Sequence, residues 1–410
     1  MSSVCEQPGL HSIEQATAAL VQLLARPTQS HRLPLHRAAG QVLAGDVYAR
    51  HDVPLWDNSA MDGYALNTAD LPATGGRLPL AGCQAAGDAI RSLPAGHCLQ
   101  IFTGAALPPG ANCVVPQEDC QPDAGGVTFG SVRTGQNIRR QGEESRSGQL
   151  LLSKGTRLRA QEVGLLASQG YAEVEVTRAL RIGIISSGNE LRDPGSPLEP
   201  GQIFDSNGHL LASLLQGWGL EVHQYPRLRD DLTDTLQLLT RAAAEQDILI
   251  SSGGVSVGEA DYLKTAVGQL GRINLWRVAI QPGKPLAFGM VGSIPWIGLP
   301  GNPGASLITT LIIARPALLA AQGQAHTSAQ VLPVTADFQW QKTSTRTRYL
   351  QARLQACDGR LTAQLHPQQS SAMLANCCWA DGMVVIPAQH SIQQGDSVPF
   401  ITYQALLSAH

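Results

Sequence analysis

Five polar loops in the middle of the sequence combine small or turn-forming residues with charged or amide side chains. They cover residues 186–190, 229–231, 251–261, 282–285 and 298–303. In an open parallel sheet, ligands bind in the crevice at the carboxyl ends of the strands. We expect these loops to surround one ligand site, provided that each of them follows a strand of such a sheet.

The loop that contains Ser252, Gly253 and Gly254 has the composition of an anion-binding turn. Glycine lets the backbone approach a ligand closely, and strand-to-helix turns point free N–H groups at a phosphate. A connecting turn without a ligand is the alternative, and for one loop alone we would favour it. Polar loops at several successive strand ends reverse that preference. We therefore expect these three residues to bind the phosphate of a cofactor or substrate.

Three carboxylates, those of Glu190, Asp230 and Asp261, belong to the same set of loops. Carboxylates near a phosphate repel it unless a hard cation lies between them, and Mg²⁺ accepts one or two carboxylates together with phosphate oxygens. The alternative is helix N-capping, which suits Asp230 or Asp231 ahead of Leu232. The pattern predicts a magnesium site made by Glu190, Asp230 and Asp261.

Lys284 is one of only four lysines in a sequence whose positive charge comes mainly from arginine. It lies between Gly283 and Pro285, in a stiff turn that would present a compact ammonium to an oxyanion. A solvated surface lysine is the alternative interpretation. We expect Lys284 to act in the site.

The elements that would position these loops alternate between strands and helices. Apolar runs predict strands near 180–185, 220–225, 247–250, 273–280, 285–290 and 296–299, and apolar periodicity predicts helices near 208–216, 232–245, 262–270 and after 303. This alternation is typical of a doubly wound, mainly parallel sheet. Helices are also expected at 12–24 and 160–168, with Ser12 as an N-cap.

Two other regions have a different character. Residues 50–145 are dense in Gly, Pro, Asn and Asp, which indicates a small β-rich domain joined by turns. Short alternating segments near 331–335, 349–355, 383–386 and 397–401 indicate a C-terminal β-barrel or sandwich. The fold class is therefore α/β plus β, in several domains.

Composition excludes several classes of protein. The 29 basic and 32 acidic residues form no basic stripe, so a nucleic-acid partner is not expected. The N-terminus lacks a secretion signal, and the apolar run 307–321 is broken by Arg315-Pro316, so no membrane span is expected. Eight cysteines without a Cys-x-x-Cys pair indicate free thiols and a cytoplasmic location, with a redox or metal pair at Cys377-Cys378 as the alternative.

Six sequence strings together resemble the molybdopterin molybdotransferase family, MoeA-type in bacteria and the E domain of gephyrin in animals. The strings are DNSAMDGYA (57–65), IFTGA (101–105), GQNIRR (135–140), SSGGVSVGEADY (251–262), PGKPLAFG (282–289) and GLPGNP (298–303). They extend over nearly the whole chain, in family order. By composition alone, 57–65 and 135–144 would be solvated turns, or would complete a site across a domain or subunit boundary.

The resemblance implies four domains: an elongated linker domain (1–50 and 146–178), a β-rich domain (51–145), an α/β molybdopterin-binding domain (179–328) and a C-terminal β-barrel (329–410). It implies a homodimer whose cleft joins the pterin domain of one subunit to the β domain of the other. The implied reaction converts adenylylated molybdopterin and molybdate into molybdenum cofactor and AMP with Mg²⁺. The implied partners are a molybdopterin adenylyltransferase and proteins that mature molybdoenzymes.

The resemblance also implies roles for individual residues. The family's important acids fall on Asp62, Glu190, Asp230 and Asp261, its functional threonine on Thr103 and a site lysine on Lys284. Its rigid site loop falls on Pro300 and Pro303. In the barrel, the positions that contact molybdate fall on Arg353 and Ser370.

Three departures from the family pattern change the expected chemistry. Gln281 stands where the family usually has lysine, Ala305 where it has serine, and Glu144 where it has aspartate. A unit charge near a partly buried oxyanion contributes on the order of 1–3 kcal/mol, so Gln281 would weaken molybdate binding about tenfold or more. A molybdopterin carrier or scaffold with weakened catalysis is therefore the second hypothesis, and the related adenylyltransferase is a third.

Overall fold

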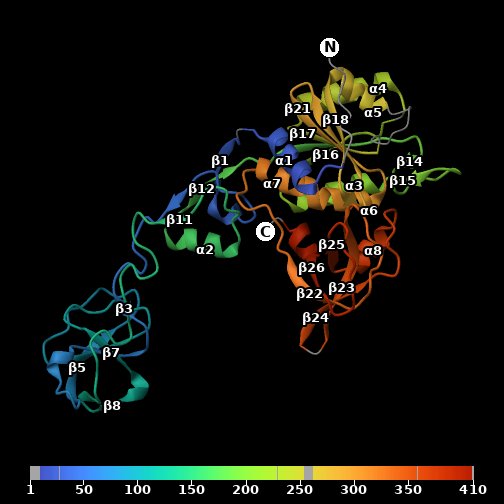
Figure 1. The fold of residues 1–410 in the computed structure, drawn as a ribbon. Coiled ribbons are helices and arrows are strands. Elements are labelled where there is room, and N and C mark those ends of the chain that lie inside the picture. Colours follow the sequence, from blue (N-terminus) through green and yellow to red (C-terminus); the bar gives the residue numbers. More distant parts are fainter. Residues whose placement is uncertain (1–9, 27, 229, 254–261, 358, 409–410) are drawn as a thin grey trace.

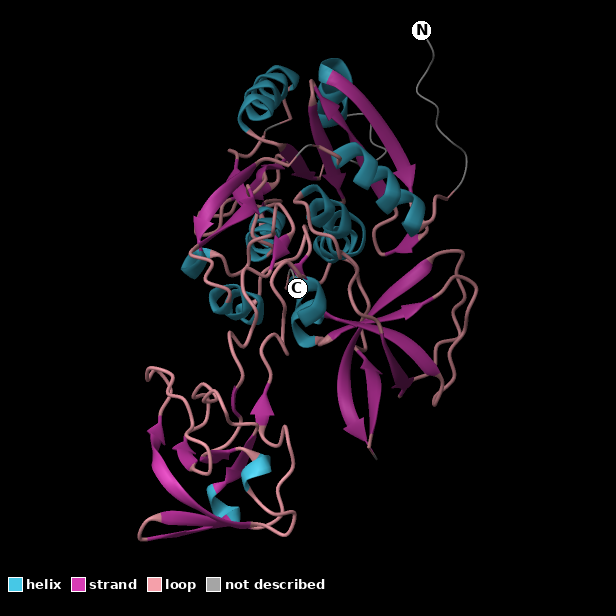
Figure 2. Cartoon of the chain, turned by 90° about the vertical axis from the view of Figure 1, so that its left-hand side faces the viewer, coloured by secondary structure: helices cyan, strands magenta, loops and turns pink. Residues whose placement is uncertain are grey.

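The computed structural model describes residues 10–26, 28–228, 230–253, 262–357 and 359–408. A β-rich part, residues 53–145, lies at one end of the molecule, and the α/β part lies at the other (Figure 1). The barrel of the last strands packs beside the α/β part, and a narrow connector leads to the β-rich part (Figure 2). The predicted fold class, α/β plus β with a parallel sheet and a C-terminal barrel, is confirmed.

The connector is made from two chain segments that pair with each other. The strand pairs are β1 (Ser30–Pro34) with β12 (Glu173–Thr177) and β2 (Val47–Tyr48) with β11 (Leu150–Leu152), both antiparallel. The 3₁₀ turn η1 (Leu35–Arg37) and helix α2 (Ala160–Ser168) complete it, and α2 has the predicted bounds. Val53 and Ser145 form an isolated bridge, so the β-rich part is an insertion whose two ends lie together.

The β-rich part contains a six-stranded mixed sheet in the order β7-β4-β6-β5-β9-β8. Its strands are β4 (Gly63–Leu66), β5 (Gly76–Gln84), β6 (Cys98–Ile101), β7 (Cys113–Pro116), β8 (Cys120–Asp123) and β9 (Gly126–Phe129). Two short strands, β3 (Asn58–Ser59) and β10 (Ile138–Arg139), pair antiparallel beside it, and the 3₁₀ turns are η2 (Thr68–Asp70) and η3 (Gln117–Asp119). The β3–β10 pair joins two of the six family strings in space.

The α/β part is a sheet in the order β16-β13-β17-β21-β20-β18, and its first four strands are parallel. The strands are β13 (Arg181–Ser186), β16 (Glu221–Gln224), β17 (Ile248–Ser252), β18 (Gly271–Arg277), β20 (Pro285–Val291) and β21 (Ile294–Leu299). β20 and β18 continue the sheet antiparallel. A short ribbon of β14 (Leu191–Arg192) and β15 (Ile203–Phe204) extends from the edge of the sheet (Figure 1).

Helices cover both faces of this sheet, as the doubly wound pattern predicts. They are α1 (Ile13–Leu24), α3 (Ser206–Gly217), α6 (Pro303–Thr309) and α7 (Arg315–Ala321) on one core, and α4 (Leu232–Glu245) and α5 (Tyr262–Leu270) on the other. Ser12 caps α1 as predicted, in a reciprocal capping box with Gln15. A π-helical turn, Thr310–Ala314, joins α6 to α7.

The continuous helical segment Pro303–Ala321 is long and apolar enough to cross a membrane, yet 83% of its most apolar window is buried inside the protein. The side chains of Leu318 and Ile313 belong to the large core of the α/β part. This helix has the burial of a core helix.

The C-terminal strands close into a five-stranded barrel, since β23 pairs with both β24 and β25. Its strands are β22 (Leu332–Ala336), β23 (Thr347–Cys357), β24 (Arg360–Leu365), β25 (Gly382–Ile386) and β26 (Ser397–Thr402), with helices α8 (Leu374–Trp379) and α9 (Tyr403–Leu407). The sequence pattern missed β24. β19 (Ile280–Gln281) pairs with β23 in parallel. The loop that follows β19, residues 282–285 with Lys284, is called the lysine loop below, and this pairing attaches it to the barrel. Tyr349 and Met383 of the barrel pack into the core of the α/β part.

Candidate active site

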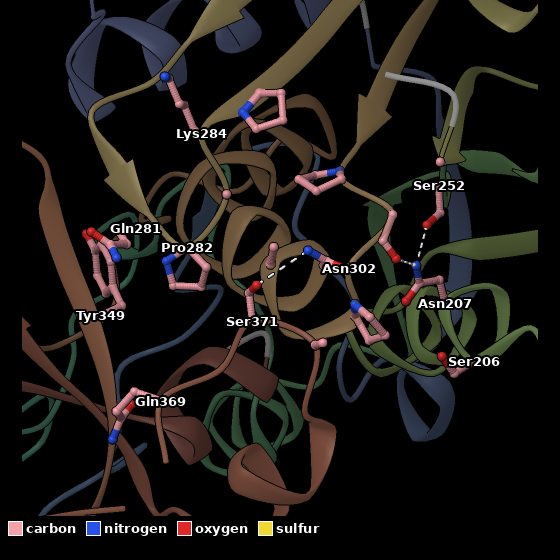
Figure 3. A pocket seen from close by; sticks show the side chains of 18 of the residues that line it. Ser206, Asn207, Ser252, Gln281, Pro282, Lys284, Asn302, Tyr349, Gln369 and Ser371 are labelled. Atoms are coloured by element: carbon pink, nitrogen blue, oxygen red, sulfur yellow. Dashed lines mark hydrogen bonds between the residues drawn. The ribbon is translucent and has the colours of Figure 1, made fainter. Parts of the chain in front are cut away.

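A hollow of about 1080 Å³ lies where the strand-end loops of the α/β part meet the barrel (Figure 3). Its α/β side includes Ser187, Glu190, Asp205, Asn207, Ser252, Gly253, Gln281, Lys284, Pro300, Asn302 and Pro303. Its barrel side includes Trp340, Lys342, Arg346, Arg348, Tyr349, Gln369 and Ser371. Loops that are more than 100 residues apart in sequence therefore share one cavity, as expected for loops at the ends of adjacent parallel strands.

Asn207 ties two of these loops together from the first turn of α3. Its Nδ2 donates to Ser252 Oγ at 2.7 Å and to the Gly301 carbonyl at 2.8 Å (Figure 3). The side chain is buried, and its Oδ1 has no hydrogen-bond partner in the described structure. We missed Asn207 in the sequence because it looks like one more helix-capping residue after Asp205, which does cap α3 through Gly208 N.

The lysine loop is held in place by close packing at Gly283. This residue has φ +111°, and a Cβ there would lie 2.3 Å from Thr309 Oγ1 on α6. Only glycine therefore lets the loop pass this close to the helix. The next residue, Lys284, is exposed at the rim of the hollow, and Val278 N donates to its carbonyl at 2.8 Å.

Gly283→Ala is expected to destabilise the protein by about 2–4 kcal/mol, because the methyl group meets Thr309 Oγ1 and the backbone is left-handed. Urea unfolding would measure it. Gly82→Ala is the matched control: its φ is +138° and a Cβ there meets nothing within 4 Å, so only about 1–2 kcal/mol of backbone strain is expected. Equal losses for the two variants would show that the contact with Thr309 is unimportant.

The predicted carboxylates do not all reach the hollow. Glu190 lines it, and Gly188 lies so close that a Cβ there would be 2.6 Å from Glu190 Oε2. Asp230 is absent from the lining; its backbone N donates to Asn189 Oδ1 at 3.2 Å, which places it near that loop. Asp261 and Gly254 lie outside the described residues. Within the described residues, no group of three or more His, Cys, Asp or Glu side chains is placed to hold a metal ion.

Among the described residues that line the hollow, positive charge exceeds negative charge. These residues include four cations, Lys284, Lys342, Arg346 and Arg348, and two carboxylates, Glu190 and Asp205. The Asp205 carboxylate caps α3 by accepting a hydrogen bond from Gly208 N, whereas Glu190 does not cap a helix. A partly enclosed cavity with this balance favours an anionic ligand.

Two barrel residues predicted to contact molybdate lie outside the lining. Arg353 donates from Nε to the Trp379 carbonyl at 2.6 Å and stacks over the Trp379 ring. Ser370 is exposed, and its neighbour Ser371 lines the hollow instead and accepts from Asn302 Nδ2 at 3.4 Å (Figure 3). Arg353 lies on β23, where successive side chains point to opposite faces, whereas Ser370 and Ser371 lie in the loop before α8.

Asp62 and Thr103 meet in the β-rich part. The Asp62 carboxylate accepts from the Thr103 backbone N and from Thr103 Oγ1, each at 2.7 Å. These hydrogen bonds, the hydroxyl's first, lower the pKa of Asp62 below its ordinary value and keep the carboxylate ionised in mild acid. Asp57 accepts from Arg140 Nη1 at 2.6 Å and so joins the strings 57–65 and 135–140.

The Asp62–Thr103 pair is not near the hollow of its own chain. Asp62 directly precedes β4 and Thr103 lies in the turn after β6, and this β-rich part lies at the opposite end of the molecule from the α/β part (Figures 1 and 2). Its sequence neighbours Met61 and Phe102 are exposed apolar side chains, and Leu55 and Trp56 are exposed in the same β-rich part.

Fold and hollow together define a multidomain protein with an α/β domain, whose strand-end loops line a hollow suited to an anionic ligand. Comparison with family models identifies the family: the MoeA N-terminal region (domain I and II) matches residues 11–170, a probable molybdopterin binding domain matches 183–320, and the MoeA C-terminal region (domain IV) matches 333–403. The chain belongs to the MoeA family.

Relatives and solved structures agree with this assignment. The molybdopterin molybdenumtransferase of Haemophilus influenzae is 38% identical over 76% of this chain and 78% of its own length. The enzyme of the same name from Nostoc sp. is 33% identical over 90% and 87%. Two structures of the molybdopterin biosynthesis MoeA protein from Pyrococcus horikoshii share the fold, with TM-scores of 0.76 and 0.83 at 29% and 24% identity. Each covers 96% of this chain, and this chain covers 99% and 100% of theirs.

Proposed function

We propose that this protein is a molybdopterin molybdenumtransferase, which combines adenylylated molybdopterin with molybdate and releases AMP. The observation that carries the proposal is the shared hollow, where glycine-containing strand-end loops, one of them carrying Lys284, face three cations on the barrel side: Lys342, Arg346 and Arg348. Both substrates are anions, and such a cavity favours them electrostatically. The relatives named above are enzymes of this kind.

Individual residues would have distinct roles in this reaction. Ser252 and Gly253 offer the β17 loop to a phosphate, and Asn207 fixes that loop against Gly301. Lys284 faces the oxyanion from a loop that Gly283 holds against α6. Pro300 and Pro303 stiffen the loop that closes the α/β side.

Of the three predicted magnesium ligands, Glu190 is the one that lines the hollow among the described residues. Glu190 is a carboxylate at the hollow that no described salt bridge engages, and Mg²⁺ needs only one or two carboxylates besides phosphate oxygens. Glu190 would hold the ion, with Asp230 from the neighbouring loop and Asp261 beyond the described residues as the further predicted ligands. When bound, the ion would polarise the phosphoanhydride.

The remote Asp62–Thr103 pair supports a homodimer. Asp62 is an ionised carboxylate held by two hydrogen bonds and flanked in sequence by the exposed Met61, and it has no function visible within the described part of its own chain. We infer that this pair completes the hollow of a second copy of the chain. We also propose the four domains with the boundaries expected from the resemblance. A cytoplasmic location, and transfer from an adenylyltransferase to maturation proteins, accord with this role.

The proposal is tested by incubating the purified protein with adenylylated molybdopterin, Mg²⁺ and molybdate and measuring AMP. Release of AMP that depends on molybdate is expected, together with cofactor rescue in a strain lacking its own molybdenumtransferase. Absence of both at saturating molybdate would overturn the assignment.

A carrier of the same fold is the second candidate, favoured by the uncharged side chains of Gln281 and Ala305 in the lining of the hollow. It would bind adenylylated molybdopterin without releasing AMP. If Gln281→Lys raises turnover sharply, the carrier interpretation gains support.

A further inference from the structure

Two short chain segments join the β-rich part to the connector (Figure 1). Residues 49–53 lead into the β-rich part and residues 145–149 lead out of it, and we call these two segments the neck. Both segments are described throughout, and apart from the bridge between Val53 and Ser145 neither of them forms a strand. The direction of the β-rich part relative to the rest of the chain therefore depends on a few contacts in the neck and not on a continuous sheet.

Gln169, at the C-terminal end of α2, contacts both segments of the neck. Its Oε1 accepts from Arg50 N at 2.8 Å and from His51 N at 3.2 Å, and its Nε2 donates to Ser145 Oγ at 3.0 Å. Backbone N–H groups can only donate, so they fix which end of the amide is the oxygen. The side chain is 0% exposed. One buried amide thus holds the incoming and the outgoing segment at the same time.

The residues that follow Gln169 hold the incoming segment as well. Arg50 Nη1 donates to the Gly170 carbonyl at 2.9 Å, and the Arg50 guanidinium lies 3.7 Å from the centre of the Tyr171 ring. Tyr171 OH donates to the Tyr48 carbonyl at 2.8 Å, one residue before the neck. The end of α2 is thus attached to the incoming segment through several groups, and the Gln169 amide extends this attachment to the outgoing segment.

Burial makes the Gln169 amide difficult to replace with water. A buried polar group that loses its partner is left without a hydrogen bond, because water does not reach it. Without the amide, Arg50 N and His51 N would lack their acceptor unless the neck moved away from α2 and exposed them to solvent. Loss of the amide should therefore release the direction of the β-rich part.

The connector does not depend on this amide for its own fold. It has an apolar core drawn from both of its chain segments, which includes Leu43, Leu158, Leu166 and Val176. The hydrogen bonds of the Gln169 side chain go to the neck and not to this core. An apolar side chain of similar size at position 169 should therefore leave the connector folded while it frees the neck.

We propose that Gln169 is a positioning residue: its amide fixes the direction of the β-rich part and thereby aims the Asp62–Thr103 pair at the hollow of a second copy. The β-rich part extends away from the neck, so a small rotation at the neck moves Asp62 through a larger arc (Figures 1 and 2). The attachment of the neck rests on the hydrogen bonds above, whereas its effect on turnover rests on the proposed function.

The first readout is the distance between two spin labels on one chain, measured by pulsed electron paramagnetic resonance. The labels are placed at Thr74 in the β-rich part and at Ala160 at the start of α2, both of which are exposed. Genetically encoded labels avoid the native cysteines, and an excess of unlabelled chain keeps labelled copies out of the same dimer. The unaltered protein should give one narrow distribution. Gln169→Met keeps the size of the side chain but removes its hydrogen bonds, and it should shift or broaden the distribution.

Ser168→Ala is the matched control, because Ser168 is an exposed neighbour whose hydroxyl donates to the Leu165 carbonyl within α2. Its distribution should equal that of the unaltered protein. Ser145→Ala removes one of the contacts of Gln169, should broaden the distribution less than Gln169→Met, and decides the question if Gln169→Met does not fold. The proposal is overturned if the folded variant of Gln169 or, in its place, Ser145→Ala gives the distribution of the unaltered protein, or if Ser168→Ala changes it equally.

The second readout is the rate of AMP release. Gln169→Met should lower kcat about tenfold or more and leave KM within about twofold, because the substrates bind in the hollow while Asp62 approaches from the partner. A changed distribution with unchanged kcat would overturn the aiming of Asp62. If the unaltered protein releases no AMP, the proposed function fails, and the distance measurement still decides whether Gln169 fixes the neck.

Discussion

A mixed dimer of one Asp62→Ala subunit and one Lys284→Ala subunit is expected to recover about half of the normal turnover, although each variant alone should lose about 100-fold or more. The reason is that Asp62 lies at the opposite end of its chain from the hollow that holds Lys284. If each hollow is completed by the other subunit, one of the two sites in the mixed dimer has both residues intact. Tandem purification with two different tags, followed by an AMP-release assay, measures it.

The matched control places both substitutions in one subunit and pairs it with an unaltered one. Shared sites then each carry one defect, and turnover should fall to the level of the single variants. Sites contained within one chain give the opposite pattern, with the control dimer half active and the first mixed dimer inactive. That reversal would refute the shared site.

Arg315→Met is expected to lower the free energy of unfolding by about 2–4 kcal/mol, because it removes the donors of three partly buried hydrogen bonds. Arg315 is 2% exposed and donates to the carbonyls of Thr327, Ala405 and Ser408. Burial, and then Arg157, lower its pKa to about 10, so it remains charged at neutral pH. Arg315 thus links the start of α7 to the C-terminal helix α9 and to the residue after it. Urea unfolding at pH 7 would show the loss of stability as a lower midpoint.

Arg360→Met is the comparison, since Arg360 is exposed on the barrel and a change within about 0.5 kcal/mol is expected. An unchanged midpoint for Arg315→Met would mean that the three carbonyls find other donors, and that this arginine does not hold the C-terminal helix in place.

The spacing of apolar residues, together with the turn-forming and helix-capping residues between the apolar segments, was enough to predict most of the fold. Helices α2, α4 and α5 have the predicted bounds, because their apolar spacing is clear. Helix α4 is also capped by Asp231, which accepts from Asp234 N. β24 escaped prediction because its burial alternates weakly and only Ala363 of it is buried. The antiparallel edge of the sheet follows from the short β20–β21 connection, which apolar content alone does not reveal.

The candidate site was predicted less completely than the fold. Glu190, Ser252, Gly253, Lys284, Pro300 and Pro303 do line one hollow, because the ends of neighbouring parallel strands must lie together. The barrel side was not predictable in the same way, because which of Arg346, Arg348 or Arg353 faces the cavity depends on the register of β23 against β19. A single sequence carries no signal for that register.

The β-rich part enters and leaves the connector at adjoining points, marked by the bridge between Val53 and Ser145. Excising the intervening residues and joining the ends with a short turn would therefore leave the remaining backbone undisturbed. If the hollow is shared between subunits as proposed, replacing this insertion with that of a related enzyme would alter what approaches the hollow of the opposite subunit and would leave the α/β part and the barrel unchanged.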